Sequence, residues 1–335
     1  MILAQALAEV RAQRAQRILP DGQAIWVSRV FPTSGATPAM PMASFVEQLA
    51  HTTIPTHFHA ANQFQVVVEG QGTLGKSAVH PWTVHYTNGF AGYGPLCANA
   101  AGMAFFTLRN HWDAGGARYF PAGQSFMQPA PKRHHLVGPL VCSSVAALHS
   151  RQHTTCDSVL AQEEDGLAVW FLHLGPGMRT HAPDSAQGGG QYLLVAGGTL
   201  VHDGALWPRL SCLYISADTG PFVLQSGAEG LEILLLQFPV AEASATQPRT
   251  MSRTPGRATA PPWQAVRQAP GCQEAMGSPP WHTRSMWPWC SKGRLRSLPG
   301  VRRIRVSVCT WPRPIWPGPT CVVPICTGPG SLELF

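Results

Sequence analysis

Two histidines separated by one residue are the part of this sequence best suited to chemistry. His57 and His59 stand in the stretch THFHAANQFQVVVEGQGTL, residues 56–74. In a β-strand, alternate side chains point to the same side, so both imidazoles can reach one ion. Imidazole nitrogens suit Fe, Mn, Ni, Cu and Zn. The pair predicts either a metal site or a pocket in which both histidines only form hydrogen bonds.

Further polar residues follow closely in the sequence. Gln63 begins the next apolar run, and Gln65 shares its face. His85 lies on a following apolar run, WTVHY. The sequence therefore predicts that Gln65 and Tyr93 line a substrate pocket beside the two histidines.

The elements that must position these residues are β-strands. Residues 22–240 hold short apolar and β-branched runs such as AIWVSRVF, FQVVVEG and LAVWFLHLG, separated by turn sequences such as TNG, GPG and HDG. No long helical period interrupts them, which favours an all-β sandwich or barrel. Residues 1–21 instead predict a short amphipathic helix, with Leu3, Leu7 and Val10 on one face and Pro20 at its end.

An internal repeat divides the β-region. Residues 179–200, RTHAPDSAQGGGQYLLVAGGTL, follow the first copy in order: a histidine segment, glutamine with an aromatic residue, an aliphatic strand, glycines and Thr-Leu. The repeat predicts two β-domains, 22–125 and 150–240, joined by a linker at 126–149. The second copy keeps too few ligands for a metal. It is either structural or an arginine-lined pocket for an anionic group, formed by Arg179, His181 and Gln191.

The spacing of the first copy resembles the first motif of the cupin family, G-x5-H-x-H-x3,4-E-x6-G. Here His57 and His59 are followed after three residues by Gln63 and after six more by Gly70. The initial glycine is absent, and glutamine replaces the family's glutamate. The family's second motif, G-x5-P-x-G-x2-H-x3-N, corresponds to GFAGYGPLCANAAGM, which has no histidine after its glycine-proline bend. The resemblance covers about residues 30–240.

This resemblance implies a bicupin, in which two double-stranded β-helix (jelly-roll) barrels stand in tandem. It also implies a homodimer, since cupin barrels often pair through edge strands. One functional hypothesis that the resemblance implies is a mononuclear Fe, Mn, Ni or Zn site in the first barrel, serving a dioxygenase-like oxidoreductase that acts on a small organic molecule. In this hypothesis His57 and His59 are ligands, and Gln63 is either a third, weak ligand or a hydrogen-bonding neighbour of the metal site. His85 replaces the missing third histidine if it points inward. The alternative is a non-enzymatic barrel that binds a small organic molecule and has lost its metal. The neutral Gln63 and the missing third histidine favour this alternative, whereas the intact histidine pair favours the enzyme.

Residues 241–335 have a different composition. They carry a formal charge of +9, against −2 for residues 1–240, and hold six of the eleven tryptophans among many Pro, Arg and Cys residues. They predict a disordered basic tail, which either binds nucleic acid or an acidic partner, or results from out-of-frame translation of a GC-rich gene. No RNA-recognition motif is visible, which favours the second interpretation and argues against a nucleic-acid partner.

The remaining features exclude several classes of protein. The sequence contains no G-x-S-x-G, phosphate loop or dinucleotide fingerprint. No apolar run approaches the ~20 residues of a membrane-spanning helix. Nine irregularly spaced cysteines without a C-x-x-C motif favour a reducing, cytoplasmic location.

Overall fold

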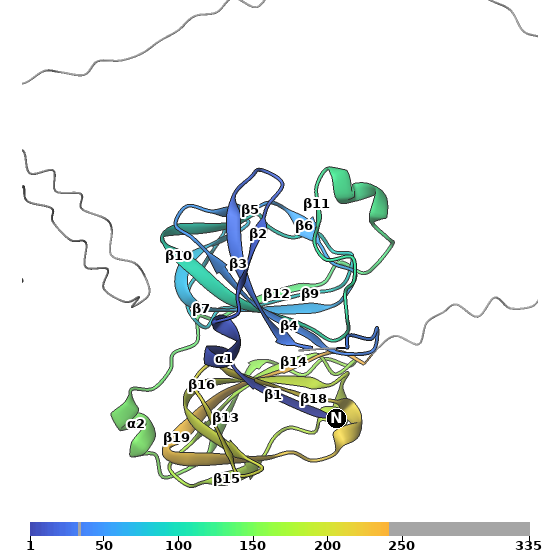
Figure 1. Ribbon diagram of the computed structural model, residues 1–335. Coiled ribbons are helices and arrows are strands. Elements are labelled where there is room, and N and C mark those ends of the chain that lie inside the picture. The colour runs from blue at the N-terminus through green and yellow to red at the C-terminus, as the bar shows by residue number, and fades with distance from the viewer. Residues whose placement is uncertain (33–34, 241–335) are drawn as a thin grey trace, which may run out of the picture. The chain divides into compact units, whose positions relative to one another are not determined.

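The computed structural model describes residues 1–32 and 35–240, which are predominantly β, as the sequence predicts (Figure 1). Most strands belong to two sheets. The N-terminal sheet contains β2 (Ala15–Ile18), β3 (Ala24–Phe31), β4 (Met42–Gln48), β5 (Thr53–Ile54), β7 (Gln63–Leu74), β8 (Ser77–Val79), β9 (Val84–Thr87), β10 (Leu96–Arg109) and β12 (His134–Val137). The C-terminal sheet contains β1 (Ile2–Ala6), β13 (Thr155–Leu160), β14 (Ala168–Leu174), β15 (Arg179–His181), β16 (Gln191–His202), β17 (Ala205–Pro208), β18 (Ser211–Ile215) and β19 (Val223–Gln237).

The described residues also form several smaller elements outside the two sheets. A two-stranded ladder joins β6 (His57–Phe58) to β11 (Arg118–Tyr119). Two short helices, α1 (Leu7–Arg11) and α2 (Val145–His149), lie in the N-terminal segment and in the segment between the sheets. Single 3-10 turns occur at Ala122–Phe126, Ser185–Gln187 and Ala217–Thr219. None of the helices described is long and apolar enough to span a membrane.

The internal repeat is visible in the register of the two longest strand pairs. β7 pairs antiparallel with β10, and β16 pairs in the same way with β19. Gly70 and Gly198 occupy equivalent places at an irregularity in each pair, both with φ of +66°. A Cβ at either position would lie 2.1 Å from a backbone oxygen of the opposite strand. Glycine is therefore required in both copies by backbone conformation and by the close approach of the neighbouring strand.

Successive side chains of β10 point alternately to two sides: a hydrophobic core shared by the two sheets, and an inner face of the N-terminal sheet. Phe106 and Leu108 join a buried cluster that also contains residues of the C-terminal sheet. The ring of Phe238, which follows β19, lies 4.9 Å from that of Phe64 on β7. Phe105 and Thr107 point to the opposite side of β10, where a cavity lies. One face of the N-terminal sheet is thus covered by the C-terminal sheet, and the other face is free to line a pocket.

The helix predicted over residues 1–21 is wrong in extent. Only Leu7–Arg11 are helical, while β1 pairs with β18 and β2 pairs with β3. An isolated helix of this length is marginal in water, whereas pairing with an available strand satisfies the backbone hydrogen bonds of the segment. Leu7 and Val10 are nevertheless buried in the core, as the amphipathic pattern predicts.

Three other predictions concern the linker, the cysteines and the tail. The segment predicted as a linker, 126–149, contains β12, which pairs with β9, and α2. The cysteines within the described part of the chain, Cys97, Cys142, Cys156 and Cys212, form no disulfide there. The predicted tail, residues 241–335, lies outside the described residues.

Candidate functional site

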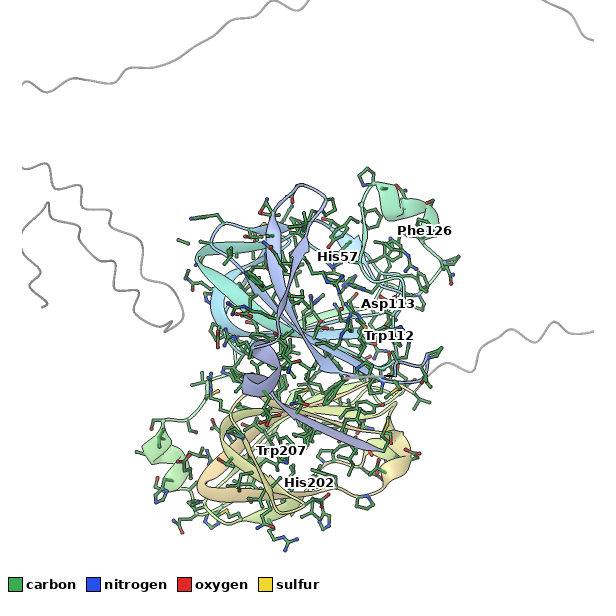
Figure 2. All side chains as sticks on the ribbon, in the orientation of Figure 1. His57, Trp112, Asp113, Phe126, His202 and Trp207 are labelled. Atoms are coloured by element: carbon green, nitrogen blue, oxygen red, sulfur yellow. The ribbon has the colours of Figure 1, made fainter. Side chains whose placement is uncertain are left out.

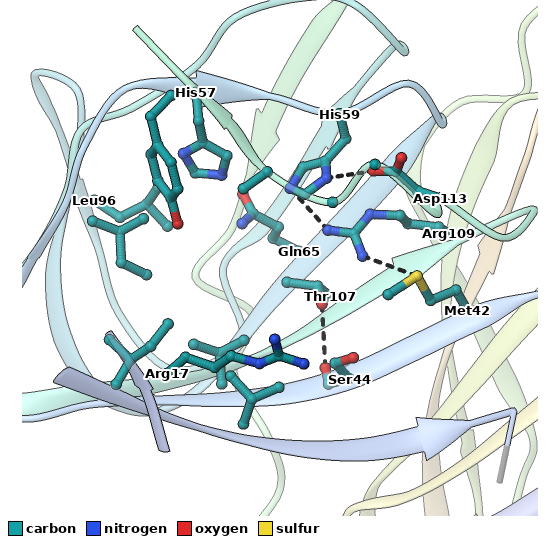
Figure 3. Close-up of a pocket in the computed structure, with 18 of the residues that line it drawn as sticks. Arg17, Met42, Ser44, His57, His59, Gln65, Leu96, Thr107, Arg109 and Asp113 are labelled. Atoms are coloured by element: carbon teal, nitrogen blue, oxygen red, sulfur yellow. Dashed lines mark hydrogen bonds and ion pairs between the residues drawn. The ribbon is translucent and has the colours of Figure 1, made fainter. Parts of the chain in front are cut away.

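A cavity of about 540 Å³ opens on the inner face of the N-terminal sheet (Figure 3). Its floor is formed by β10, with Phe105, Thr107 and Arg109 in alternation, and its walls include strands β2 to β4. The segment that follows β10, which carries Trp112 and Asp113, lines another side. The volume lies within the range typical of small-molecule sites, roughly 300–1,000 Å³.

His57 enters this cavity from β6. Its backbone exchanges two hydrogen bonds with Tyr93, at 3.1 and 3.0 Å, and its ring packs 4.6 Å from the Tyr93 ring and 5.4 Å from that of Tyr119. The Nδ1 atom donates to the carbonyl oxygen of Pro55 at 2.7 Å. A carbonyl can only accept, so Nδ1 carries the proton and Nε2 keeps its lone pair. His57 thus offers one acceptor nitrogen to the site.

His59 has partners on both nitrogens. Its Nδ1 lies 2.6 Å from Oδ2 of Asp113, and its Nε2 lies 2.9 Å from Nη2 of Arg109. A guanidinium can only donate, so Nε2 accepts from Arg109 and Nδ1 donates to Asp113. Figure 3 shows His59 linked by dashed lines to both Asp113 and Arg109. His59 therefore has no lone pair left for a further ligand.

Burial keeps both histidines uncharged. It lowers the pKa of His57 to about 4 and that of His59 to about 3, and the charge of Arg109 disfavours protonation of both. For Asp113, burial opposes ionisation, but the hydrogen bond from His59 and the nearby arginines outweigh it and lower its pKa. At neutral pH, His57 and His59 are therefore neutral imidazoles beside the Asp113 carboxylate and the buried Arg109 guanidinium.

Arg109 is the central charge of the site. Its side chain ends β10 and is 5% exposed. Beyond its bond to His59, Nη1 contacts only the sulfur of Met42, at 3.5 Å, and Nε is buried with no hydrogen-bond partner among the described residues. On the far side of the strand, the hydroxyl of Tyr192 donates to the Arg109 carbonyl oxygen at 3.1 Å. The C-terminal sheet thus fixes the backbone that carries this arginine.

The other two predicted metal ligands have different partners. Gln63 donates from Nε2 to the hydroxyl of Tyr93 at 2.7 Å, and it does not line the cavity. His85 donates from Nδ1 to Oε1 of Gln65 at 2.9 Å and stacks on His134, and burial lowers its pKa to about 3. Of the predicted metal set, only His57 and His59 line the cavity, with ring centroids 5.3 Å apart. The predicted pocket residues Gln65 and Tyr93 line it as well.

This donor set does not fit a metal ion. The part of the chain that the structure describes contains no group of three or more His, Cys, Asp or Glu residues placed to hold one. The nitrogen of His59 that faces the cavity already accepts from Arg109. The positive charge of that guanidinium also opposes the approach of a divalent cation. Of the two histidines that line the cavity, only His57 keeps an imidazole lone pair that no described residue occupies.

In the second copy of the repeat, the structure separates the three predicted pocket residues. Arg179 and His181 are exposed on β15, whereas Gln191 is completely buried and donates to the Pro183 carbonyl and to Gln237. The three predicted residues therefore do not share an accessible pocket. Strand register equates the positions of Gln65, His85 and Thr107 with three leucines of a packed apolar cluster: Leu193, Leu213 and Leu235.

Sequence reasoning missed the charged residues of the cavity. Arg109 ends the apolar run MAFFTLR and alternates with Phe105 and Thr107, so the period of two could have assigned it to the inner face. Asp113 lies on an irregular segment and has no such signal. Figure 2 shows its position beside Trp112 and below His57, while the labelled His202 and Trp207 belong to the C-terminal sheet.

Comparisons with known proteins give similarity in structure only. No family model and no curated protein matches the sequence. Among solved structures, the chain is similar to the bacterial pirin YhhW from Escherichia coli in complex with nickel(II), with 12% identity, a TM-score of 0.45, and coverage of 72% of this chain and 100% of that chain. Salicylate 1,2-dioxygenase from Pseudoaminobacter salicylatoxidans gives 12% identity, a TM-score of 0.45, and coverage of 70% and 80%.

A cupin 2 conserved barrel domain protein from Leptotrichia buccalis gives 12% identity, a TM-score of 0.38, and coverage of 64% of this chain and 88% of that chain. The similar structures are cupin-fold proteins, and this is the family that the histidine motif resembles.

Proposed function

We propose that the two sheets form tandem cupin barrels and that the cavity of the first binds a small organic molecule without a metal ion. The observation that carries this proposal is the 2.9 Å contact between Nη2 of Arg109 and Nε2 of His59. It places a fixed positive group at the nitrogen that a metal would need. Arginine stays charged at any physiological pH, so the site keeps a cation of its own.

The composition of the cavity supports a binding role. Apolar side chains form much of its wall, and a few convergent polar groups, among them His57, Gln65 and Arg109, can orient a ligand. Such a mixture is typical of small-molecule sites. The equivalent interior of the C-terminal sheet is filled by aliphatic side chains, which supports a structural role for the second barrel.

The alternative function is a metal-dependent, dioxygenase-like oxidoreductase. It would require the hydrogen bond between His59 and Arg109 to break. In addition, either Gln63 would have to leave Tyr93, or His85 would have to leave Gln65, and turn toward the cavity. Each buried polar group that loses its partner costs about 1–3 kcal/mol. The present hydrogen bonds therefore favour the metal-free binding module. A homodimer and a cytoplasmic location stay predictions from the sequence.

Titration of the full chain with N-phenyl-1-naphthylamine, a neutral fluorescent probe, tests the binding function. Val27 lines the cavity from β3, so Val27→Trp should fill it and weaken probe binding about tenfold or more. Gln16→Trp, on the exposed strand β2, is the matched control and should bind as the unsubstituted chain does. We expect saturable binding that EDTA does not change. Binding that is absent, equal in both variants, or abolished by EDTA would contradict the proposal.

A further inference from the structure

We propose that the ligand of this cavity is an organic carboxylate, held between Arg29 and Arg109 with its apolar part against the aliphatic wall. This inference rests on the proposed function, because it names the ligand class of the same cavity. It arises from charges that the sequence analysis did not assign to any site.

The cavity carries an excess of positive charge. Arg17, Arg29 and Arg109 line it, and Asp113 is the one carboxylate among its described lining residues. That carboxylate already accepts from His59. Arg17 is exposed to water, but Arg29 is half-buried and Arg109 is buried. The guanidiniums of Arg29 and Arg109 against the one carboxylate leave an uncompensated positive charge beside two neutral imidazoles. An anionic ligand is the simplest group that can balance this charge.

Hydrogen-bond donors at the cavity lack acceptors. Nε of Arg109 and Nη1 of Arg29 are buried, and neither has a partner among the described residues. Arg109 is itself almost completely buried, so its missing acceptors cannot be replaced by bulk water. An unpaired buried donor is costly, and more so on a charged group. A planar guanidinium matches the two oxygens of a carboxylate, which could accept from both arginines.

The positive charges of the three arginines that line the cavity also repel one another. Burial lowers the pKa of Arg29, and the charges of Arg109 and Arg17 lower it further. The guanidinium of Arg29 is held over the ring of Trp112, with Cζ 5.0 Å from the centroid. Figure 3 shows Arg17 directed across the cavity toward Ser44. A ligand with a negative group between these side chains would remove repulsion that the empty arrangement retains.

The rest of the wall selects for an apolar body. A continuous group of aliphatic and aromatic side chains faces the same space: Ile25, Val46, Ile54, Leu96 and Phe105. Inorganic phosphate or sulfate would balance the charge but leave this surface uncovered. Burying apolar area contributes about 25 cal/mol per Å². The arginines and the apolar wall together favour an acid with a ring or a medium-length alkyl chain.

Isothermal titration calorimetry on the full chain tests the charge requirement directly. The probes are benzoate with benzamide, hexanoate with hexanamide, and inorganic phosphate. Each amide keeps the size of its acid but removes the negative charge. We expect each carboxylate to bind about tenfold or more tightly than its amide, and both carboxylates to bind more tightly than phosphate. Amides that bind as tightly as the acids, acids that show no binding, or tightest binding of phosphate would overturn the inference.

Substitutions then locate the charge. Because Arg109→Gln could unfold the chain, Arg17→Gln with Arg29→Gln is the main variant, and we expect its benzoate Kd to rise about tenfold. Benzamide binding should change little. Arg14→Gln is the matched control, since Arg14 stacks over Trp26 and does not line the cavity. Unchanged benzoate affinity in the main variant, or loss in Arg179→Gln instead, would overturn the inference.

The two proposals fail in different ways. If the neutral naphthylamine probe binds and is blocked by Val27→Trp while acids and amides compete with it equally, the cavity binds small molecules without preference for carboxylates. If acids bind but Val27→Trp has no effect on them or on the probe, the cavity itself is not the binding site, and both proposals fail.

Discussion

Acidification should destabilise this protein through three buried histidines. His57, His59 and His85 are buried, and burial lowers their pKa values to about 4, 3 and 3. An unfolded histidine has a pKa of about 6.5. Since the folded pKa lies below the unfolded one, the neutral form favours folding. The stability is complete above pH 6.5 and is lost as the pH falls toward the folded pKa values.

The magnitude follows from proton uptake by the unfolded chain. Between pH 7.5 and 5.5, each unfolded histidine gains about 0.8 of a proton, while its folded counterpart gains almost none. Integrated over the two pH units, this lowers the free energy of unfolding by about 1.4 kcal/mol per histidine. Three histidines give about 4 kcal/mol, a large part of the 5–15 kcal/mol typical of folded domains. Asp113 titrates below this window, because its pKa is lowered from 3.8.

Urea denaturation of the full chain, followed by circular dichroism at pH 7.5, 6.5 and 5.5, measures this loss. In His85→Gln the difference between pH 7.5 and 5.5 should shrink by about 1.4 kcal/mol. His153→Gln, at an exposed position, should leave the difference unchanged. A free energy of unfolding that stays constant or rises on acidification would refute the reasoning. If the pH dependence of the free energy of unfolding is the same in His85→Gln, the contribution of about 1.4 kcal/mol assigned to His85 is wrong.

Three further predictions concern the support of the site. Phe238→Ala should lower the free energy of unfolding by about 3–5 kcal/mol in urea, because the fully buried ring joins the cores of both sheets; a loss below about 1 kcal/mol would contradict a shared core. Tyr192→Phe removes the donor to the Arg109 carbonyl and should cost about 0.5–1.5 kcal/mol in thermal unfolding, whereas an unchanged midpoint would show that water replaces it. Gln63→Glu restores the acid of the cupin motif but should confer no stoichiometric metal by elemental analysis, because His59 still accepts from Arg109; a metal-loaded variant would contradict this.

The sequence predicts the general fold because the signals for it are local. Alternating apolar runs and turn sequences need no knowledge of distant partners, and they give the all-β fold correctly. Gly70 and Gly198 recur because the same close strand approach occurs in both copies. The face shared by His57 and His59 also follows from local spacing, and both side chains do line one cavity.

The chemistry of the site depends on register and on loops, which local signals do not carry. Whether His59 is free depends on Arg109, fifty residues later, and on Asp113 in an irregular segment. Likewise, β1 becomes a strand only because β18, more than two hundred residues away, offers an edge to pair with. Gln63 matches the position of a family ligand, but Tyr93 takes its amide nitrogen.

Elemental analysis of the purified full chain, after growth and dialysis with Fe, Mn, Ni and Zn supplied, tests the central claim most directly. A chain in which His57→Ala and His59→Ala are combined serves as the reference. If Arg109 holds the cavity-facing nitrogen of His59, both proteins should contain no stoichiometric metal. About one metal ion per chain in the unsubstituted protein, absent from the double variant, would contradict the account and make the histidine pair a metal site.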